Sequence, residues 1–154
     1  MFHITIQYTT NKTLAPKASL LRQWAKMALS KKVISAEMTI RIVGAHEIAL
    51  LNAIYRHKKI PTNVLSFPLN IPNVIPMVTP LLGDVIICAD VVNQEAREQH
   101  KSQYAHWAHM VIHGILHLLG FDHEKKKDAK IMESLEIEIL QSLGFTNPYK
   151  VLRG

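Results

Sequence analysis

Residues 106–123 read HWAHMVIHGILHLLGFDH, and this segment decides how the second half of the chain folds. We predict a helix over residues 102–119, which contains most of the segment. Gly120 follows at once, and glycine readily adopts the left-handed conformation that ends a helix and reverses the chain. The segment therefore predicts a long helix closed by a tight turn.

The rest of the chain divides into strands and helices by the spacing of its apolar residues. Alternation of apolar and polar residues indicates half-buried strands, whereas recurrence every three or four residues indicates helices. Three prolines within residues 69–82 exclude regular structure there and predict a long loop. Strands are expected at residues 2–8, 37–44, 63–67 and 84–88, and helices at residues 19–30, 47–57, 90–98, 102–119 and 128–143.

This order of elements predicts an α+β fold, in which a mixed sheet of about four strands has about five helices packed on it. Hydrophobic residues make up 48% of the 154 residues and charged residues 19%, which is enough apolar material for one core. No linker interrupts the pattern, so we expect residues 1–154 to form a single domain. In the helix at 47–57, Ile48, Leu51 and Tyr55 are expected to point inward.

The cysteine content and the beginning of the chain indicate where the protein works. Cys88 is the only cysteine, so no internal disulfide can form, and a reducing compartment suits it best. The first residues lack the basic flank and apolar stretch of a secretory signal. No apolar run approaches the ~20 residues that span a bilayer. We therefore expect a soluble, cytoplasmic protein.

The chain carries a formal net charge of +6, with 18 lysines and arginines against 12 aspartates and glutamates. A basic balance favours polyanionic partners such as nucleic acid or an anionic membrane surface. The excess is moderate, and a merely solubilising surface would give the same balance. Charge alone leaves both interpretations open.

Three histidines in and after the central helix have the spacing of metal ligands. His113 and His117 are four residues apart, which places both imidazoles on one helix face, about 6 Å apart along the axis. Their ring nitrogens can then converge on one ion at about 2.0–2.1 Å. The turn at Gly120 can return His123 as a third ligand, completing the pattern H-x-x-x-H-x-x-G-x-x-H. An isolated histidine pair of this kind is more often surface or core, and the third histidine favours metal binding.

Three protein ligands leave a coordination position for water, which is typical of a catalytic zinc site rather than a structural one. Bound zinc can lower the pKa of its water to about 7. We therefore expect one divalent transition-metal ion, with zinc as the first choice and nickel as an alternative, since imidazole ligands suit both.

The neighbouring polar residues each allow more than one role. His109 lies on the same helical stripe, but three ligands over two turns would rise about 12 Å, too far to share one ion. It is expected to contact a ligand, pack in the core or lie near the substrate, and His106 likewise. Asp122 could orient a metal ligand through its ring N–H, or it could be an exposed turn residue.

The histidine spacing matches the metzincin protease pattern except at one position. Gly114 stands where a protease carries the glutamate that serves as general base. Without that carboxylate, zincin-type peptide cleavage lacks its proton acceptor. Met132 could be mistaken for the methionine of a metzincin Met-turn, but it lies in a helical pattern and is expected in the core. A protease is therefore disfavoured.

The segment HGILHLLGFDH resembles the H-G-x-L-H-L-x-G-[YF]-D-H signature of the YbeY family of bacterial metal-dependent endoribonucleases implicated in rRNA maturation. The resemblance is colinear over about residues 38–148 and implies a single YbeY-like metallohydrolase domain. It implies that His113, His117 and His123 are the metal ligands. Phe121 stands where the family often has tyrosine, which affects no proposed ligand. The supporting blocks are NAIYRHKKIPTNVLSFP (52–68), LLGDVIIC (81–88), AHWAHMVIHG (105–114) and MESLEIEIL (132–140).

The resemblance also assigns a catalytic role to Arg56, which corresponds to an arginine of the family. Guanidinium makes charge-assisted, often bidentate contacts to phosphate and can stabilise charge that develops in phosphoryl transfer. His57, Lys58 and Lys59 extend this basic stretch. The alternative is a solvated helix end, where the dipole favours cations.

The family implies a single-strand-specific, metal-dependent endoribonuclease that acts at the 3′ end of 16S rRNA and in ribosome quality control. The implied partners are single-stranded rRNA and the small ribosomal subunit or its assembly factors, without a membrane and without DNA specificity. Two alternatives remain open. One is a non-nucleolytic ribosome-assembly factor with a structural metal, and the other is a metal-dependent hydrolase of another substrate.

Overall fold

The computed structural model describes residues 1–69 and 79–150 and contains one mixed sheet of four strands. The strands lie in the order β1 (Phe2–Tyr8), β2 (Ala36–Val43), β4 (Leu81–Cys88) and β3 (Val64–Pro68). β2 is parallel to both β1 and β4, whereas β3 runs antiparallel to β4. Because β3 is an edge strand, Pro68 interrupts no ladder on its outer side. The predicted mixed sheet is confirmed.

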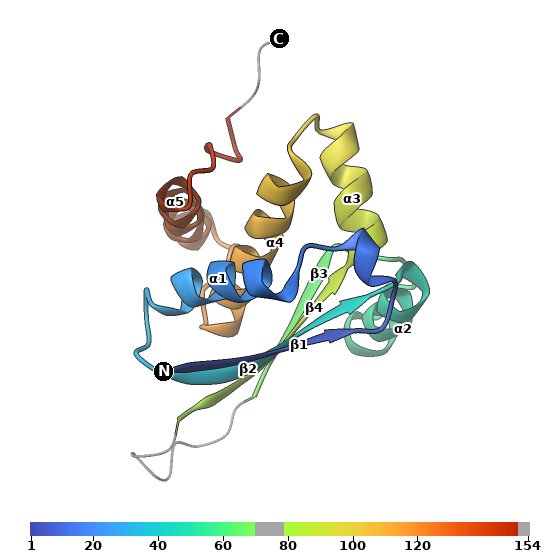
Figure 1. Cartoon of the computed structure of the whole chain (residues 1–154), viewed down its shortest axis with the longest axis horizontal. Helices are drawn as coiled ribbons and strands as arrows, with labels where there is room; N and C mark the ends of the chain where they lie inside the picture. Colours follow the sequence, from blue (N-terminus) through green and yellow to red (C-terminus); the bar gives the residue numbers. More distant parts are fainter. Residues whose placement is uncertain (70–78, 151–154) are drawn as a thin grey trace.

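Within the described residues, five α-helices cover the sheet unequally (Figure 1). A large hydrophobic cluster joins one face of the sheet to three helices that lie on it and to the start of a fourth, and a smaller cluster that includes Ile48 and Leu65 lies on the other face, beneath a fifth helix. The predicted α+β class is confirmed. The helices are α1 (Ala18–Leu29), α4 (Gln103–Leu118) and α5 (Lys126–Ser142) on the first face, α2 (Ala45–Arg56) on the second, and α3 (Ala89–Glu98) directly after β4; a short 3-10 helix spans Lys12–Leu14.

The central helix is α4, which is buried on most sides because it lies between the sheet and α5. Ser102 caps its beginning by accepting a hydrogen bond from the backbone of Ala105. Gly114 lets the helix lie close to the sheet. A Cβ atom there would be 2.6 Å from Cγ1 of Val85 and 3.0 Å from Cγ2 of Val64. A larger residue would push α4 away from the strands.

Two details differ from the sequence predictions. The strand expected at 84–88 begins earlier, at Leu81, because Leu81 pairs with Glu37 of β2 and this pairing outweighs the nearby prolines. Tyr55 is 61% exposed rather than inward, and its ring packs edge-on against Phe67 instead. The loop predicted over residues 69–82 is wrong at Leu81 and Leu82, which belong to β4, and its residues 70–78 lie outside the described residues. None of the helices in the described ranges has the length and apolar character needed to cross a bilayer.

Candidate metal centre

The structure brings His113, His117 and His123 together. One nitrogen of each ring lies within 4.8 Å of the others. The ring centroids are 4.7 Å apart for His113 and His117, 4.7 Å for His117 and His123, and 5.4 Å for His113 and His123. Tetrahedral ligands at ~2.05 Å from a zinc ion are roughly 3.4 Å apart, so small side-chain rotations would let the three rings share one ion. The donor set therefore fits the predicted metal, and the ligand roles stay a prediction.

The chain reversal that delivers His123 is a helix C-cap centred on Gly120. Gly120 has a φ of +100°, which a residue with a Cβ rarely adopts. Its N–H donates to the carbonyl of His117 at 3.0 Å, and the N–H of Phe121 donates to that of Leu116 at 3.0 Å. These two bonds are the Schellman arrangement. Lys32 closes the end of α4 by donating to the carbonyl of Leu119 at 2.7 Å. The turn is thus fixed by backbone bonding.

The electrostatics of this cluster keep His117 neutral. Burial disfavours the charged ring, and the neighbouring imidazoles of His113 and His123 act in the same direction. Together they lower the pKa of His117 from 6.5 to about 4. At neutral pH its ring therefore has a free lone pair, which is the form that binds metal.

The three imidazoles line a pocket of about 350 Å³ between α2, β3 and α4. Arg56 lines the same pocket from the last turn of α2, which ends where His57 adopts a left-handed conformation. Ser66 lines it from β3, but its hydroxyl donates to the carbonyl of Gly114 at 2.7 Å and so ties the strand to α4. The predicted catalytic arginine and the predicted ligands thus share one pocket.

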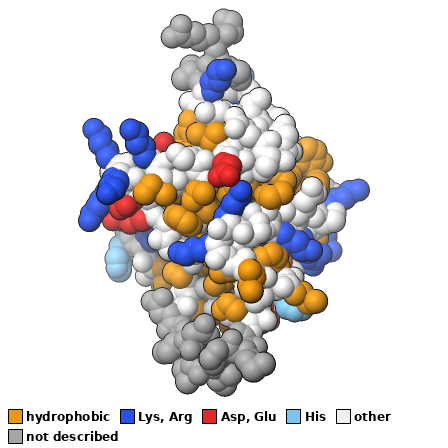
Figure 2. Space-filling view, turned by 90° about the vertical axis from the view of Figure 1, so that its left-hand side faces the viewer, with side chains coloured by type: hydrophobic (Ala, Val, Ile, Leu, Met, Phe, Trp, Pro, Cys, Tyr) orange, Lys and Arg blue, Asp and Glu red, His pale blue; other side chains and the backbone are white. Residues whose placement is uncertain are grey.

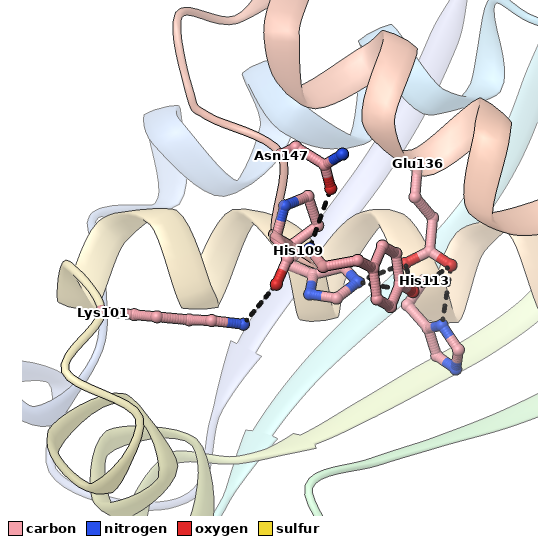
Figure 3. Close-up of polar contacts among 7 residues, drawn as sticks. Lys101, His109, His113, Glu136 and Asn147 are labelled. Carbon is pink, nitrogen blue, oxygen red and sulfur yellow. Dashed lines mark hydrogen bonds and ion pairs between the residues drawn. The ribbon is translucent and has the colours of Figure 1, made fainter. Parts of the chain in front are cut away.

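Sequence reasoning missed the carboxylate of Glu136, which lies directly behind the histidines. Glu136 is only 1% exposed and reaches α4 from α5, where it contacts the Nε2 atom of His109 (Figure 3). Its other oxygen is 3.4 Å from Nδ1 of His113. Tyr149 donates from Oη to both carboxylate oxygens, at 3.1 and 3.0 Å. One signal was available, because Glu136 falls on the inward stripe of α5 with Met132, Ile139 and Leu140.

The same contacts decide the charge state of this cluster. Burial opposes ionisation of Glu136, but the hydrogen bonds and charges of His109 and His113 outweigh it and lower the pKa of Glu136 to about 2. Burial and the nearby negative charge raise the pKa of Tyr149, so its hydroxyl remains a donor. Glu136 is therefore an ionised acceptor surrounded by donors.

The remaining polar residues take structural positions. His106 is 3% exposed, and its Nε2 lies 3.0 Å from Glu95 of α3. Burial lowers the pKa of His106, although Glu95 opposes the change. Asp122 accepts hydrogen bonds from the backbone N–H groups of His123 and Glu124, at 2.7 and 3.2 Å. These contacts favour the interpretation of Asp122 as a turn residue over its interpretation as a residue that orients a metal ligand. Met132 is fully buried, as expected of a core residue.

Comparisons with known proteins agree with the resemblance seen in the sequence. A family model described as Endoribonuclease YbeY matches residues 4–144. A curated protein of Nitrosococcus oceani named Endoribonuclease YbeY is 49% identical over 147 residues, which cover 96% of each chain. The solution structure of TM1509 from Thermotoga maritima superposes with a TM-score of 0.59 at 26% identity, covering 97% of this chain and 99% of that one. The chain therefore belongs to the Endoribonuclease YbeY family.

Proposed function

We propose that this chain is a metal-dependent endoribonuclease that cuts single-stranded RNA. The observation that carries the proposal is the shared pocket, in which Arg56 and three convergent imidazoles face one space of about 350 Å³. The printed name of the Nitrosococcus oceani relative supplies the substrate class, since that protein is named an endoribonuclease. Family membership and pocket chemistry thus agree on hydrolysis of a phosphodiester.

The residues of the pocket divide the work. His113, His117 and His123 would hold the metal ion, with zinc as the preferred ion and nickel as the alternative. A bound divalent ion of this kind supplies Lewis-acid polarisation and acidifies water. Arg56 would bind the scissile phosphate through its guanidinium and offset the negative charge that builds up on the phosphate oxygens. The turn at Gly120 keeps His123 in reach of the other two rings.

The size of the pocket supports a single-stranded substrate. A flexible strand can bend one phosphate into a recess of about 350 Å³, whereas a duplex holds its phosphates on a stiff outer surface. The net charge of +6 supports a polyanionic partner. Figure 2 shows lysine and arginine side chains spread over one face of the molecule with few acidic ones among them. We propose rRNA, including the 3′ end of 16S rRNA, as the target, with action on the small ribosomal subunit and in ribosome quality control.

Cleavage of end-labelled single-stranded RNA by the purified protein tests this proposal, with a duplex of the same sequence run in parallel. We expect cutting of the single strand that EDTA abolishes, that zinc or nickel restores and that His117→Ala eliminates. His3→Ala is the matched control, because His3 is an exposed histidine on β1, at the opposite edge of the sheet from β3. Equal cleavage by wild type and His117→Ala would overturn the proposal and favour a non-nucleolytic assembly factor. Turnover of another substrate without RNA cleavage would favour a different hydrolase.

A further inference from the structure

The group behind the candidate metal centre has one acceptor and three donors. Glu136 is buried, and its carboxylate oxygens, which accept hydrogen bonds, meet two ring nitrogens and one hydroxyl. Its three neighbours must therefore donate hydrogen bonds to it. The donors are the Nε2–H of His109, the Nδ1–H of His113 and the Oη–H of Tyr149. This matching fixes which ring nitrogen of each histidine carries the proton.

The tautomer of His113 has a consequence for the pocket. With the hydrogen on Nδ1, the lone pair lies on Nε2, the nitrogen that points away from Glu136 in Figure 3. A metal ion can bind only through a nitrogen that carries a lone pair. Free histidine exchanges between two tautomers and rotates freely, and both freedoms would cost metal affinity. A carboxylate on Nδ1 removes both and makes Nε2 more basic.

We propose that Glu136 is a positioning residue that sets the tautomer and orientation of His113 for metal binding, and that Tyr149 holds Glu136 in place from the C-terminal segment. This inference rests on the proposed metal-binding role of His113. The group formed by Glu136, His109, His113 and Tyr149 is called the carboxylate clasp below.

Tyr149 is itself held in place, which connects residues 147–150 to the carboxylate clasp. The side chain of Asn147 accepts a hydrogen bond from the backbone N–H of Tyr149 at 2.8 Å. Lys101, which precedes α4, donates to the carbonyl of Pro148 at 3.0 Å, and Figure 3 shows this bond beside the clasp. The His109 and Tyr149 rings also meet edge to face, with centroids 5.4 Å apart. The segment therefore has contacts on both sides of the tyrosine.

The first test is zinc affinity, measured on metal-free protein by competition with a chromophoric chelator. Glu136→Gln keeps the shape of the side chain but removes its negative charge, and it places an amide N–H group against the donors of the histidines and Tyr149. We therefore expect zinc to bind about 10- to 100-fold more weakly. Tyr149→Phe removes one hydroxyl, and we expect a loss of about two- to tenfold. Two matched controls are Glu138→Gln on the exposed side of α5 and Tyr104→Phe, whose side chain is 54% exposed on α4. Both should bind zinc like the wild type.

The second test reads the tautomer directly. Long-range ¹H–¹⁵N NMR of metal-free wild type should show the proton of His113 on Nδ1, and Glu136→Gln should move it toward Nε2. A wild-type His113 protonated on Nε2 overturns the inference, and it does so even if Glu136→Gln fails to fold. Unchanged zinc affinity in folded Glu136→Gln also overturns it, assigning the carboxylate to stability alone. A wild type that binds no zinc instead refutes the proposed metal-dependent function, so the two failures are distinguishable.

Discussion

The two halves of α4 carry histidines on one continuous face, yet the halves have opposite surroundings. His106 and His109 in the first half are 3% and 7% exposed, and each contacts a buried or half-buried glutamate from another helix. His113 and His117 in the second half are only partly buried and line a pocket. Helical spacing alone therefore does not decide what a histidine does. The partner that each ring meets across the helix decides it.

His113 stands at the boundary between the halves and has the surroundings of both. One of its nitrogens faces Glu136, as the buried rings face glutamates, and its ring lies 4.7 Å from that of His117. A ring nitrogen that faces a carboxylate carries a hydrogen and donates it. The other nitrogen of His113, on the pocket side, then keeps its lone pair. Substitutions in each half should therefore have opposite effects on stability and on RNA cleavage.

The largest expected effect is on the pocket half. His117→Ala should lower RNA cleavage by about 1,000-fold or more, because two ligands bind zinc far more weakly than three. The same variant in metal-free form should unfold at nearly the wild-type urea concentration, since His117 contacts other imidazoles rather than a buried charge. Single-turnover cleavage and urea unfolding measure the two effects. A large loss of metal-free stability would mean that His117 is structural like the buried histidines.

The buried half should show the reverse pattern. His109→Leu removes a hydrogen-bond partner from the buried carboxylate of Glu136, and leaving a buried charged acceptor short of a partner costs about 3 kcal/mol. We expect the free energy of unfolding of the metal-free protein to fall by about this amount, measured by urea denaturation monitored by circular dichroism. Metal-free His117→Ala is the control. A fall below about 1 kcal/mol would mean that burial does not make His109 structural.

Arg56→Ala tests how the pocket half of the site acts on RNA once a metal ion is bound. Arg56→Ala should lower RNA cleavage about 10- to 100-fold while the metal content stays at the wild-type level, since Arg56 lines the pocket without contributing a ligand. Cleavage assays with elemental analysis of the same samples measure both quantities. Arg97→Ala is the control, because Arg97 is also an exposed arginine in the last turn of a helix. Loss of metal together with cleavage would give Arg56 a structural role.

The smallest expected effect is a pH dependence in the buried half. Burial lowers the pKa of His106 below its ordinary 6.5, so the unfolded chain binds more protons there than the folded one. The stabilising contribution of a neutral His106 is therefore complete well above pH 6.5 and is lost as the pH falls below it.

His106→Asn should remove this dependence, because asparagine does not titrate. Comparing the free energy of unfolding of metal-free wild type and variant between pH 5 and 8 measures it. His3→Asn, at an exposed histidine, should keep the wild-type slope. Identical slopes for wild type and His106→Asn would contradict the prediction.

The sequence predicted those parts of the site that depend on one helix and its end. The positions of His113 and His117 on one face, and the reversal at Gly120, follow from local rules of helix geometry and capping. The resemblance added Arg56, which the structure places in the same pocket. Element order was predictable for the same reason, because apolar periodicity is local.

Features that depend on packing between distant segments were missed, because local spacing does not identify the partner that a side chain meets. Glu136 belongs to the clasp only because α5 packs against α4, and a glutamate within an amphipathic helix is ordinarily exposed. Tyr149 lies beyond the last helix, where no periodicity indicates its direction. Tyr55 was predicted inward from helical spacing, but the buried stripe of α2 contains only Ile48 and Asn52.

Gly114 has a consequence for how this scaffold could change its chemistry. The position that bears a glutamate in metzincins here faces strand side chains, with space for a hydrogen atom and no more. A glutamate could not be introduced by a single substitution, because Val85 and Val64 would have to shrink or α4 would have to withdraw from the sheet. A shift of α4 would carry His113 and His117 with it. Introducing the glutamate of a peptidase would thus disrupt the histidine arrangement with which it would have to act. A change in the packing of α4, and not only one amino-acid substitution, therefore separates this chain from a peptidase.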